Sequence, residues 1–455
     1  MTEHNNVLRR SVIRFVFIFL FLLAMDSSGS EEKPDKSTTP PSPAAIELSD
    51  YGNIVTAEPV AKILRIWGFD GHEYQDLWKA ESVQYESAAI GDIDDDPNTT
   101  EIVAPNICLA REEKNGIRTE YIKMFINVYQ DGPANQNPMG VWDTTYYSSN
   151  PLDYLKSNDS YTKNTEIIID NVDNALSGNE IVLKGYSNLG VFRYNPEYDK
   201  DGKFHLQGIA QVHYPEEFML QSLATADLYG DSASEIILAL NKKGFENNAL
   251  INIYNGSDLE LLKSIPIDAR LNDESLCISR NPAASPLIFS PGYRYNESYS
   301  TADAYIFKWN INGDLELEFA IDKLNGRNGF PPNVNMDMGD VDDDGRDEIV
   351  LGSDEPDYLI VYEYENGTLV DKATLTKADP PFSQYDRINI KNVDIHDSDG
   401  DGYNEIIVSG SGPFDKKIPD AYLQVFKYSD GSLIPAWPEK IKNLGSEISG
   451  KAIGK

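Results

Sequence analysis

Residues 397–408 read DSDGDGYNEIIV, and this stretch decides how the chain is organised. Asp397, Asp399 and Asp401 alternate with small residues, and Glu405 stands directly before a run of β-branched residues. Carboxylates at alternate positions of a tight turn point toward one centre, and Gly402 permits the sharp bend. The apolar run after the glutamate has the composition of a β-strand. The stretch therefore predicts an acidic loop that leads into a strand.

Four other stretches resemble this loop, which indicates an internal repeat. The first acids of the five copies are Asp92, Asp170, Asp227, Asp340 and Asp397. Their successive spacings are 78, 57, 113 and 57 residues, so the period is 57 and the third interval spans two periods. The longer first interval predicts an insertion of about twenty residues around 131–160.

A hairpin follows each loop, and this predicts the fold class. Two examples are YLIVYEYENGTLVDKATL (358–375) and YLQVFKYSDGSLIPAWP (422–438). Asn-Gly or Asp-Gly between alternating β-formers is a strong hairpin signal. Each repeat then reads as strand A, acidic loop, strand B, strand C, turn and strand D, and we count seven such hairpins. We predict an all-β fold, a seven-bladed β-propeller of four-stranded antiparallel blades.

The two ends of the repeat region predict how the ring closes. The C-terminal EISGKAIGK (447–455) resembles the strand A segment ESAAIGD (86–92), and SDYGNIVTA (49–57) resembles the end of a loop plus strand B. A C-terminal strand that joins the first blade completes the ring and covers its sheet edges. The alternative, a chain that stops inside an eighth repeat, stays open.

The N-terminal region predicts export from the cell. Three arginines within the first 14 residues precede FVFIFLFLLAM (15–25), a pattern typical of a secretory signal peptide. Residues 1–30 are therefore interpreted as a signal peptide or an uncleaved N-terminal anchor. Residues 31–44 are rich in Ser, Thr and Pro and are expected to form a disordered tether. The propeller is expected over 45–455, secreted or at the cell surface.

The acidic loops predict Ca²⁺ binding, because calcium takes six to eight hard oxygen ligands. An EF-hand is excluded, since its twelfth loop position is an acid and here that position is Val408. Pro97 replaces the glycine of the Asp92 copy, and Tyr229 replaces the second acid of the Asp227 copy. The expected ligands are Asp397, Asp399, Asp401, the Tyr403 carbonyl and Glu405; Asp340, Asp342, Asp344, the Arg346 carbonyl and Glu348; Asp92, Asp94, Asp96, Asn98 and Glu101; and Asp227, Asp231 and Glu235.

The pattern DxDxDGxxE followed by Ile or Val, repeated at this period, resembles the FG-GAP/VCBS repeat family, the integrin-alpha-type β-propellers. The resemblance covers nearly all of residues 45–455. It implies a secreted or surface-displayed protein whose loop calcium is structural.

The charge and the motifs of the chain reduce the number of function classes that fit it. The chain has 74 acidic against 39 basic residues, a formal charge of −35, which argues against nucleic-acid binding. The first hypothesis is a binding or adhesion module for an extracellular protein or glycan, monomeric, which meets a membrane only through its possible anchor. The alternative is a carbohydrate-active enzyme, since some polysaccharide lyases, including rhamnogalacturonan lyases, resemble this loop pattern. Because GxSxG and HExxH are absent, no catalytic residue is predicted. The insertion at 131–160 is the expected recognition surface.

Overall fold

The structure is a computed structural model, and it describes most of the chain from residue 53 onward. The predicted signal or anchor (1–30), the tether (31–44), Asn98 and the insertion at 131–160 lie outside the described residues. The described ranges are 53–58, 63–81, 87–96, 99–114, 117–130, 165–175, 178–185, 188–195, 206–215, 217–244, 248–271, 276–279, 286–296, 299–310, 315–322, 334–354, 357–365, 368–384, 389–411, 421–443 and 450–454.

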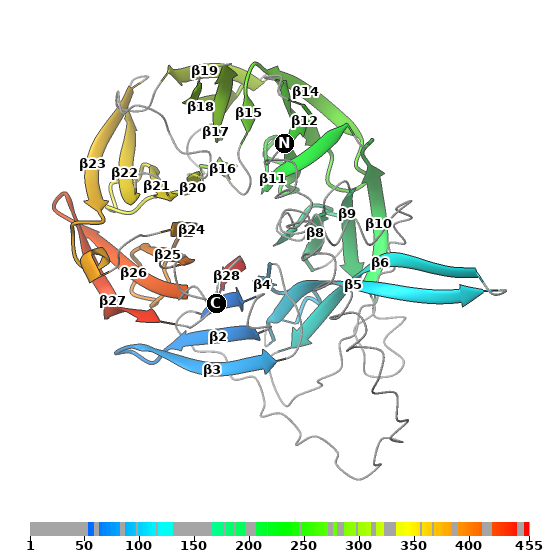
Figure 1. Cartoon of the computed structure of the whole chain (residues 1–455), viewed down its shortest axis with the longest axis horizontal. Coiled ribbons are helices and arrows are strands. Elements are labelled where there is room, and N and C mark those ends of the chain that lie inside the picture. Colours follow the sequence, from blue (N-terminus) through cyan, green and yellow to red (C-terminus); the bar gives the residue numbers. More distant parts are fainter. Residues whose placement is uncertain are drawn as a thin grey trace, which may run out of the picture. The chain divides into compact units, whose positions relative to one another are not determined.

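The described residues form seven antiparallel β-sheets, which are the blades of a seven-bladed β-propeller (Figure 1). Blade 1 contains β28 (Gly450–Gly454), β1 (Asn53–Glu58), β2 (Ile63–Phe69) and β3 (Tyr74–Glu81). Blade 2 contains β4 (Ala89–Gly91), β5 (Glu101–Lys114) and β6 (Ile117–Gln130). Blade 3 contains β7 (Glu166–Asp170), β8 (Glu180–Lys184), β9 (Asn188–Tyr194) and β10 (Leu206–His213).

The remaining blades follow the same order around the ring. Blade 4 contains β11 (Phe218–Ala226), β12 (Glu235–Lys242), β13 (Ala249–Tyr254) and β14 (Leu261–Ile267). Blade 5 contains β15 (Arg270–Leu271), β16 (Cys277–Ile278), β17 (Leu287–Asn296), β18 (Tyr299–Trp309) and β19 (Leu315–Asp322). Blade 6 contains β20 (Val334–Gly339), β21 (Glu348–Asp354), β22 (Asp357–Glu365) and β23 (Thr368–Thr376). Blade 7 contains β24 (Asn389–His396), β25 (Glu405–Ser411), β26 (Ala421–Ser429) and β27 (Ser432–Asn443).

The predicted fold class is confirmed, with two departures from four strands in a blade: blade 2 has three strands among the described residues, and blade 5 has five. Its innermost strand is divided into two short pieces, β15 and β16, which both pair with β17. One short 3₁₀ helix, η3 (Phe382–Gln384), lies among the described residues and packs its Phe382 between blades 6 and 7. Within that part of the chain, no helix has the length and apolar character that crossing a membrane requires.

The core lies between the blades, since each sheet faces two neighbours and is apolar on both faces. Seven clusters of buried apolar side chains occur among the described residues, and each joins two adjacent blades. The cluster between blades 7 and 1 contains Trp67 and Tyr74 of blade 1 and Trp437 of blade 7. The ring centroid of Trp437 lies 6.0 Å from that of Trp67 and 5.1 Å from that of Tyr74.

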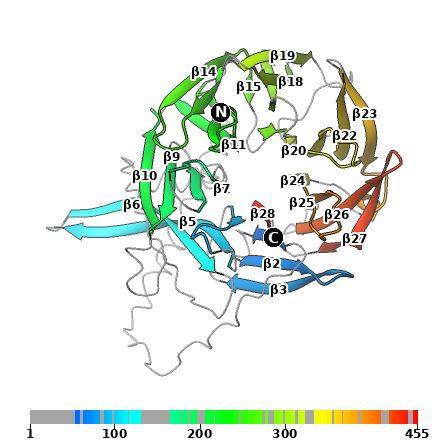
Figure 2. The same ribbon diagram turned by 180° about the vertical axis from the view of Figure 1, so that it is seen from behind.

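Backbone pairing closes the ring at blade 1. Strand β28, from the C-terminal end of the chain, pairs antiparallel with β1, so that Ile54 stands opposite Ile453 and Val55 opposite Ala452. Blade 1 thus combines one C-terminal strand with three N-terminal strands. The view from behind shows the same order of blades around the ring (Figure 2). The one-plus-three closure predicted from the two ends is confirmed.

Candidate metal centres in the A–B loops

The predicted acidic loops connect the first and second strands of their blades, and they are called A–B loops here. They are the Asp92 loop (92–101) of blade 2, the Asp227 loop (227–235) of blade 4, the Asp340 loop (340–348) of blade 6 and the Asp397 loop (397–405) of blade 7. In each loop the first acid follows strand A and the last acid opens strand B. The repeat therefore places all four loops at equivalent points of their blades.

The first aspartate of each loop organises the turn behind it. In the Asp397 loop, Asp397 Oδ1 accepts a hydrogen bond from the Gly400 N–H (2.7 Å) and Oδ2 accepts one from the Gly402 N–H (3.1 Å). Gly402 has φ 93°, a left-handed conformation that favours glycine. The Asp340 loop has the same arrangement, with Gly345 N–H donating to Asp340 Oδ2 at 2.8 Å. The glycine of the motif is thus required by the backbone.

The last glutamate of each loop closes the turn from the opposite side. Its Oε2 accepts a hydrogen bond from the backbone N–H of the loop's second residue. The donors are Ile93 to Glu101 (2.9 Å), Leu228 to Glu235 (2.9 Å), Val341 to Glu348 (3.0 Å) and Ser398 to Glu405 (2.9 Å). All four glutamates are buried at the start of strand B, so each carboxylate is held in one orientation.

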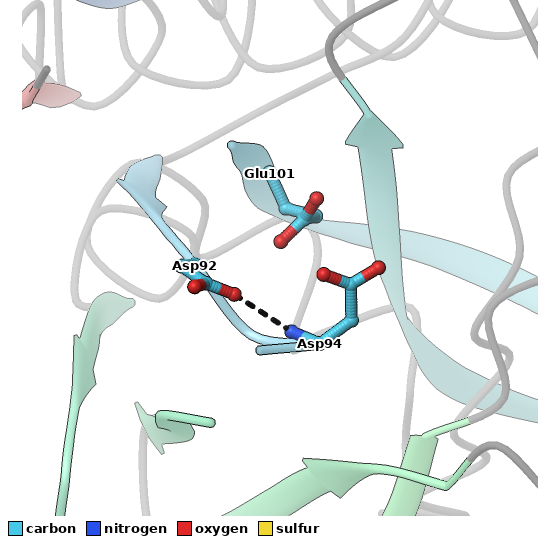
Figure 3. A group of neighbouring side chains, drawn as sticks. All are labelled: Asp92, Asp94 and Glu101. Atoms are coloured by element: carbon cyan, nitrogen blue, oxygen red, sulfur yellow. Dashed lines mark hydrogen bonds between the residues drawn. The ribbon is translucent and has the colours of Figure 1, made fainter. Parts of the chain in front are cut away.

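Three of the loops gather carboxylates closely enough to share a cation. Among the described residues, three groups have one ligand oxygen per residue within 4.8 Å of the others: Asp92, Asp94 and Glu101; Asp340, Asp342 and Asp344; and Asp397, Asp399 and Glu405. In the first group the carboxylates of Asp94 and Glu101 face each other, and the Asp94 N–H donates to Asp92 Oδ1 (Figure 3). Carboxylate oxygens in this arrangement are the donors that calcium prefers.

Buried oxygens without a hydrogen bond provide the test of whether a metal fits. Glu101 and Glu348 are both 0% exposed, and within the described part of the chain their Oε1 atoms accept no hydrogen bond. The same holds for Oδ1 of Asp342. A buried carboxylate oxygen left without a partner is costly, and a bound cation would satisfy it. The donor set of the Asp92 and Asp340 loops therefore fits a hard divalent cation.

Burial and mutual repulsion raise the pKa of the closing glutamates. Burial is the main cause in each case, and the neighbouring aspartates add to it while the backbone N–H opposes it. The pKa of Glu101 rises to about 7, that of Glu235 to about 7 and that of Glu348 to about 8. The pKa of Glu405 is raised for the same first reason. Without a cation, these loops hold charge that the protein interior opposes.

Basic side chains surround the rim of the Asp340 loop. Arg346 forms ion pairs with Asp344, Glu363 and Glu365. Burial would raise the pKa of Asp344, but the Arg346 hydrogen bonds hold it below its usual value. Lys372 Nζ lies 2.6 Å from Glu363 Oε2 and 3.6 Å from Asp342 Oδ2. Glu363 and Glu365 thus provide acids outside the loop that bind these two cations.

In the Asp397 loop a lysine reaches the carboxylates themselves. Lys427 of β26 places Nζ 2.9 Å from Asp399 Oδ2 and 3.2 Å from Glu405 Oε1, and it also contacts Asp401. Asp401 is not part of the close carboxylate group, whereas Asp399 and Glu405 are. The Ser398 hydroxyl donates to Glu405 Oε2 (2.9 Å) and contacts the Tyr74 hydroxyl of blade 1. This loop is therefore tied to the blade that closes the ring.

The Asp227 loop keeps the turn but changes the third position. Asp227 accepts hydrogen bonds from Gly230, Asp231 and Ser232, as the first acid of the motif does. Asp227, Asp231 and Glu235 are not among the close carboxylate groups found in the described residues. Tyr229 stands where the second acid would be, and its ring packs edge-on against Trp309 of blade 5 at 5.3 Å.

The structure places half of the predicted ligands in the close carboxylate groups. It brings nine of them together in two aspartate–glutamate groups and one group of three aspartates, and Asp96, Asp401 and Glu348 lie in the same loops outside those groups. Arg346 and Tyr403, predicted to contribute carbonyls, lie in their loops, with Tyr403 57% exposed. Sequence reasoning missed Lys427, Glu363 and Lys372. The register of the two strands after each loop could have identified these residues, since it places Glu363 opposite Glu348.

Contacts between blades connect successive A–B loops. The Asn404 side chain, in the Asp397 loop, donates to the Asp340 carbonyl at 2.7 Å. The Asn179 side chain of blade 3 donates to the Asp92 carbonyl at 2.9 Å. The N–H of Ser234 donates to the Asn171 carbonyl at 2.8 Å. In all three cases the residue before the closing glutamate contacts the loop of the preceding blade, so the loops support one another around the ring.

Comparisons with known proteins found similar chains only among solved structures, at low sequence identity. No family model matches the chain, and no curated protein matches it. Among solved structures, the rhamnogalacturonan lyase YesW is 13% identical, with 79% of this chain and 71% of that chain covered and a TM-score of 0.38. An Agrocybe aegerita lectin, described as recognising non-reducing terminal N-acetylglucosamine, is 14% identical over 89% and 92%, with a TM-score of 0.43. A Bacillus licheniformis rhamnogalacturonan lyase is 12% identical over 81% and 70%, with a TM-score of 0.34.

Proposed function

We propose that this chain is a secreted or surface-displayed calcium-binding β-propeller of the FG-GAP/VCBS type. In this proposal, calcium is structural and the ring acts as a binding or adhesion module for an extracellular protein or glycan. The observation that carries the metal assignment is the set of buried, unpartnered oxygens, Oε1 of Glu101 and Glu348, in loops that also gather aspartates. The binding role rests on the rigid ring and on the long insertion at 131–160.

In the Asp92 and Asp397 loops, calcium would be held by the aspartates at the first and third positions together with the closing glutamate. In the Asp340 loop, Asp344 would join the aspartates at the first and third positions. When bound, it supplies two positive charges to carboxylates that otherwise repel one another. The loops' own backbone N–H groups orient the first aspartate and the glutamate, so the chain keeps these carboxylates in place before a metal arrives. Metal binding is thereby coupled to the stability of the folded ring.

The metal assignment is tested by titrating calcium into the chelated protein in a calorimeter and by thermal melting with and without a chelator. We expect saturable binding and a melting temperature that rises with calcium. Magnesium at equal concentration serves as the control, because it demands a smaller octahedral site. A melting curve that is identical with calcium and with chelator would contradict the assignment.

The binding role is tested with a panel of glycans and surface proteins, using the intact chain and a variant in which residues 135–160 are replaced by a short Gly-Ser linker. We expect a ligand that the intact chain binds and the variant does not, with both proteins melting at the same temperature. Equal binding by both proteins would remove the insertion from the proposal. Cleavage of an acidic polysaccharide in the same assay would favour the carbohydrate-active enzyme instead.

A further inference from the structure

The residue opposite the closing glutamate differs from blade to blade. In the B–C pairing, Glu101 stands opposite Gln130 and Glu348 stands opposite Glu363. In blade 7, Ile406 pairs with Phe426, so the next residues along the two strands are Glu405 and Lys427. One position of the repeat is therefore neutral in blade 2, acidic in blade 6 and basic in blade 7.

This difference changes what the buried glutamate oxygen meets. The Oε1 atoms of Glu101, Glu348 and Glu405 all accept no hydrogen bond within the described residues, so the loops differ only in the charge that lies beside this oxygen. In the Asp397 loop the corresponding oxygen of Glu405 lies 3.2 Å from the Lys427 ammonium, which also lies 2.9 Å from Asp399. The ammonium thus contacts two of the three residues of the close group, Asp399 and Glu405.

We propose that Lys427 is a tethered counter-ion of the Asp397 loop, which calcium must displace, so that the loop with the most regular sequence is the weakest of the three calcium sites. This inference rests on the proposed calcium-binding function and deepens it. It assigns Lys427 as a residue that sets the affinity of one loop.

The physical reason is that two cations compete for the same carboxylates. A calcium ion among Asp397, Asp399 and Glu405 would repel an ammonium that contacts the same oxygens, and the repulsion is strong where water is scarce. The Lys427 side chain is 37% exposed, so its long stem offers a way for the charged end to move toward solvent. Displacing it costs the ion pairs with Asp399 and Glu405, and this cost is subtracted from the binding of the metal.

In blade 6, acids outside the loop weaken this competition. The two rim cations of this blade, Arg346 and Lys372, are shared with acids outside the loop: Arg346 pairs with Glu363 and Glu365 as well as with Asp344, and Lys372 pairs with Glu363. Lys372 lies 3.6 Å from Asp342 and so stays at the edge of the carboxylate group. The cations beside the Asp340 loop are therefore divided between loop acids and outside acids, whereas the ion pairs of Lys427 within the described residues are all with acids of the Asp397 loop, Asp399, Asp401 and Glu405.

The test measures calcium binding to the Asp397 loop with and without the ammonium. A background variant carrying D94N and D342N weakens the other two sites while keeping a side-chain oxygen at each position. In that background, K427Q is expected to tighten calcium binding about tenfold, since it removes a full positive charge from contact with the ligands. K308Q is the matched control, because Lys308 is an exposed lysine on the equivalent strand of blade 5 and its removal is expected to leave the affinity unchanged.

Melting curves provide a second measurement that does not depend on affinity. Without calcium, K427Q is expected to melt below the parent protein, because the loop acids lose their counter-charge; with saturating calcium the two are expected to melt together. Calcium affinity that K427Q leaves unchanged or weakens, with D397N abolishing the same binding event, would overturn the role of Lys427 and leave the calcium assignment intact. A protein that binds no calcium with or without Lys427 would overturn both.

Discussion

At the scale of single residues, Glu348 combines complete burial, an oxygen without a hydrogen bond and a pKa that burial raises to about 8. We predict that E348Q raises the melting temperature of the calcium-free protein, since the amide keeps the shape but carries no buried charge. The rise in melting temperature on adding calcium should shrink by about a third, because one of three loops loses its closing ligand. E260Q, at an exposed turn position, is the control. A variant that is less stable without calcium yet keeps the full calcium effect would contradict this prediction.

The same glutamates predict how stability depends on pH. The pKa of Glu348 rises from its ordinary 4.5 to about 8, and that of Glu101 rises to about 7. Between pH 5 and pH 8 the folded protein therefore holds protons that the unfolded chain has released. Their stabilising contribution is fully present below pH 4.5 and is lost as the pH rises through these values. In calcium-free buffer, we expect the melting temperature to fall by on the order of 3 °C between pH 5.5 and pH 8.

Calcium opposes the protonation of these glutamates, since it binds the ionised carboxylates. With saturating calcium the melting temperature should change less over that pH range, and the gap between the calcium and calcium-free curves should widen as the pH rises. The E348Q variant should show a flatter calcium-free curve than the parent. A calcium-free melting temperature that climbs from pH 5.5 to pH 8 would be inconsistent with the raised pKa values.

At the scale of strands, blades 6 and 7 approach each other so closely that a side chain is excluded at Gly352 of β21. A Cβ built there would lie 2.4 Å from Ile390 Cγ2 and 2.8 Å from Val393 Cγ2, both on β24. We predict that G352A lowers the free energy of unfolding by about 1–3 kcal/mol, because the added carbon overpacks the interface between two blades. Chemical denaturation measures the change.

Gly208 of β10 offers the matched control for this substitution. A Cβ there would meet Phe192 at 3.7 Å, an ordinary contact, and the residue is exposed on the outermost strand of its blade. G208A should therefore change the free energy of unfolding by less than about 0.5 kcal/mol. Equal losses for the two variants would mean that glycine is needed for backbone freedom in both strands, and the close-approach explanation for Gly352 would fail.

The strands and loops were predictable from sequence because local residues determine them. Asp-Gly turns and β-branched runs mark each repeat, and the fragment 447–455 can be matched to strand A by inspection. Lys427 was missed because it approaches Glu405 only through the pairing of β25 with β26. The contact of Tyr229 with Trp309 joins residues of different blades, so the packing of one blade on the next had to be known first. Local turns are encoded locally, whereas the charge inside a loop depends on strand register.

At the scale of the whole molecule, the ring depends on contacts between the first and last blades. The cluster between them contains Trp67, Tyr74 and Trp437, and the Tyr74 hydroxyl contacts Ser398 of the Asp397 loop. Strand β28 completes blade 1 by pairing with all but one residue of β1. A propeller with an open blade would expose the edge of β1 and the apolar faces beside it, so closure governs both stability and self-association.

The last prediction therefore concerns the removal of residues 450–455. The truncated chain loses five residue pairs between β28 and β1. At about 1 kcal/mol for each backbone hydrogen bond, the free energy of unfolding should fall by on the order of 4 kcal/mol. Ile54 and Val55, both 0% exposed in the closed ring, would then lie beside an unpaired strand edge. We expect the truncated protein to melt earlier and to associate at high concentration, as measured by thermal scanning and size-exclusion chromatography.

A synthetic peptide with the sequence of residues 446–455 distinguishes strand pairing from a general loss of chain. Added to the truncated protein, it should restore the melting temperature and the elution position of the intact chain, because it can pair with β1 as β28 does. A peptide of the same composition in scrambled order should have no effect. The order of residues along a strand decides which face of the sheet each side chain meets, so a scrambled strand does not match β1. A truncated protein that melts like the intact chain would show that blades 1 and 7 hold the ring closed through their side chains alone.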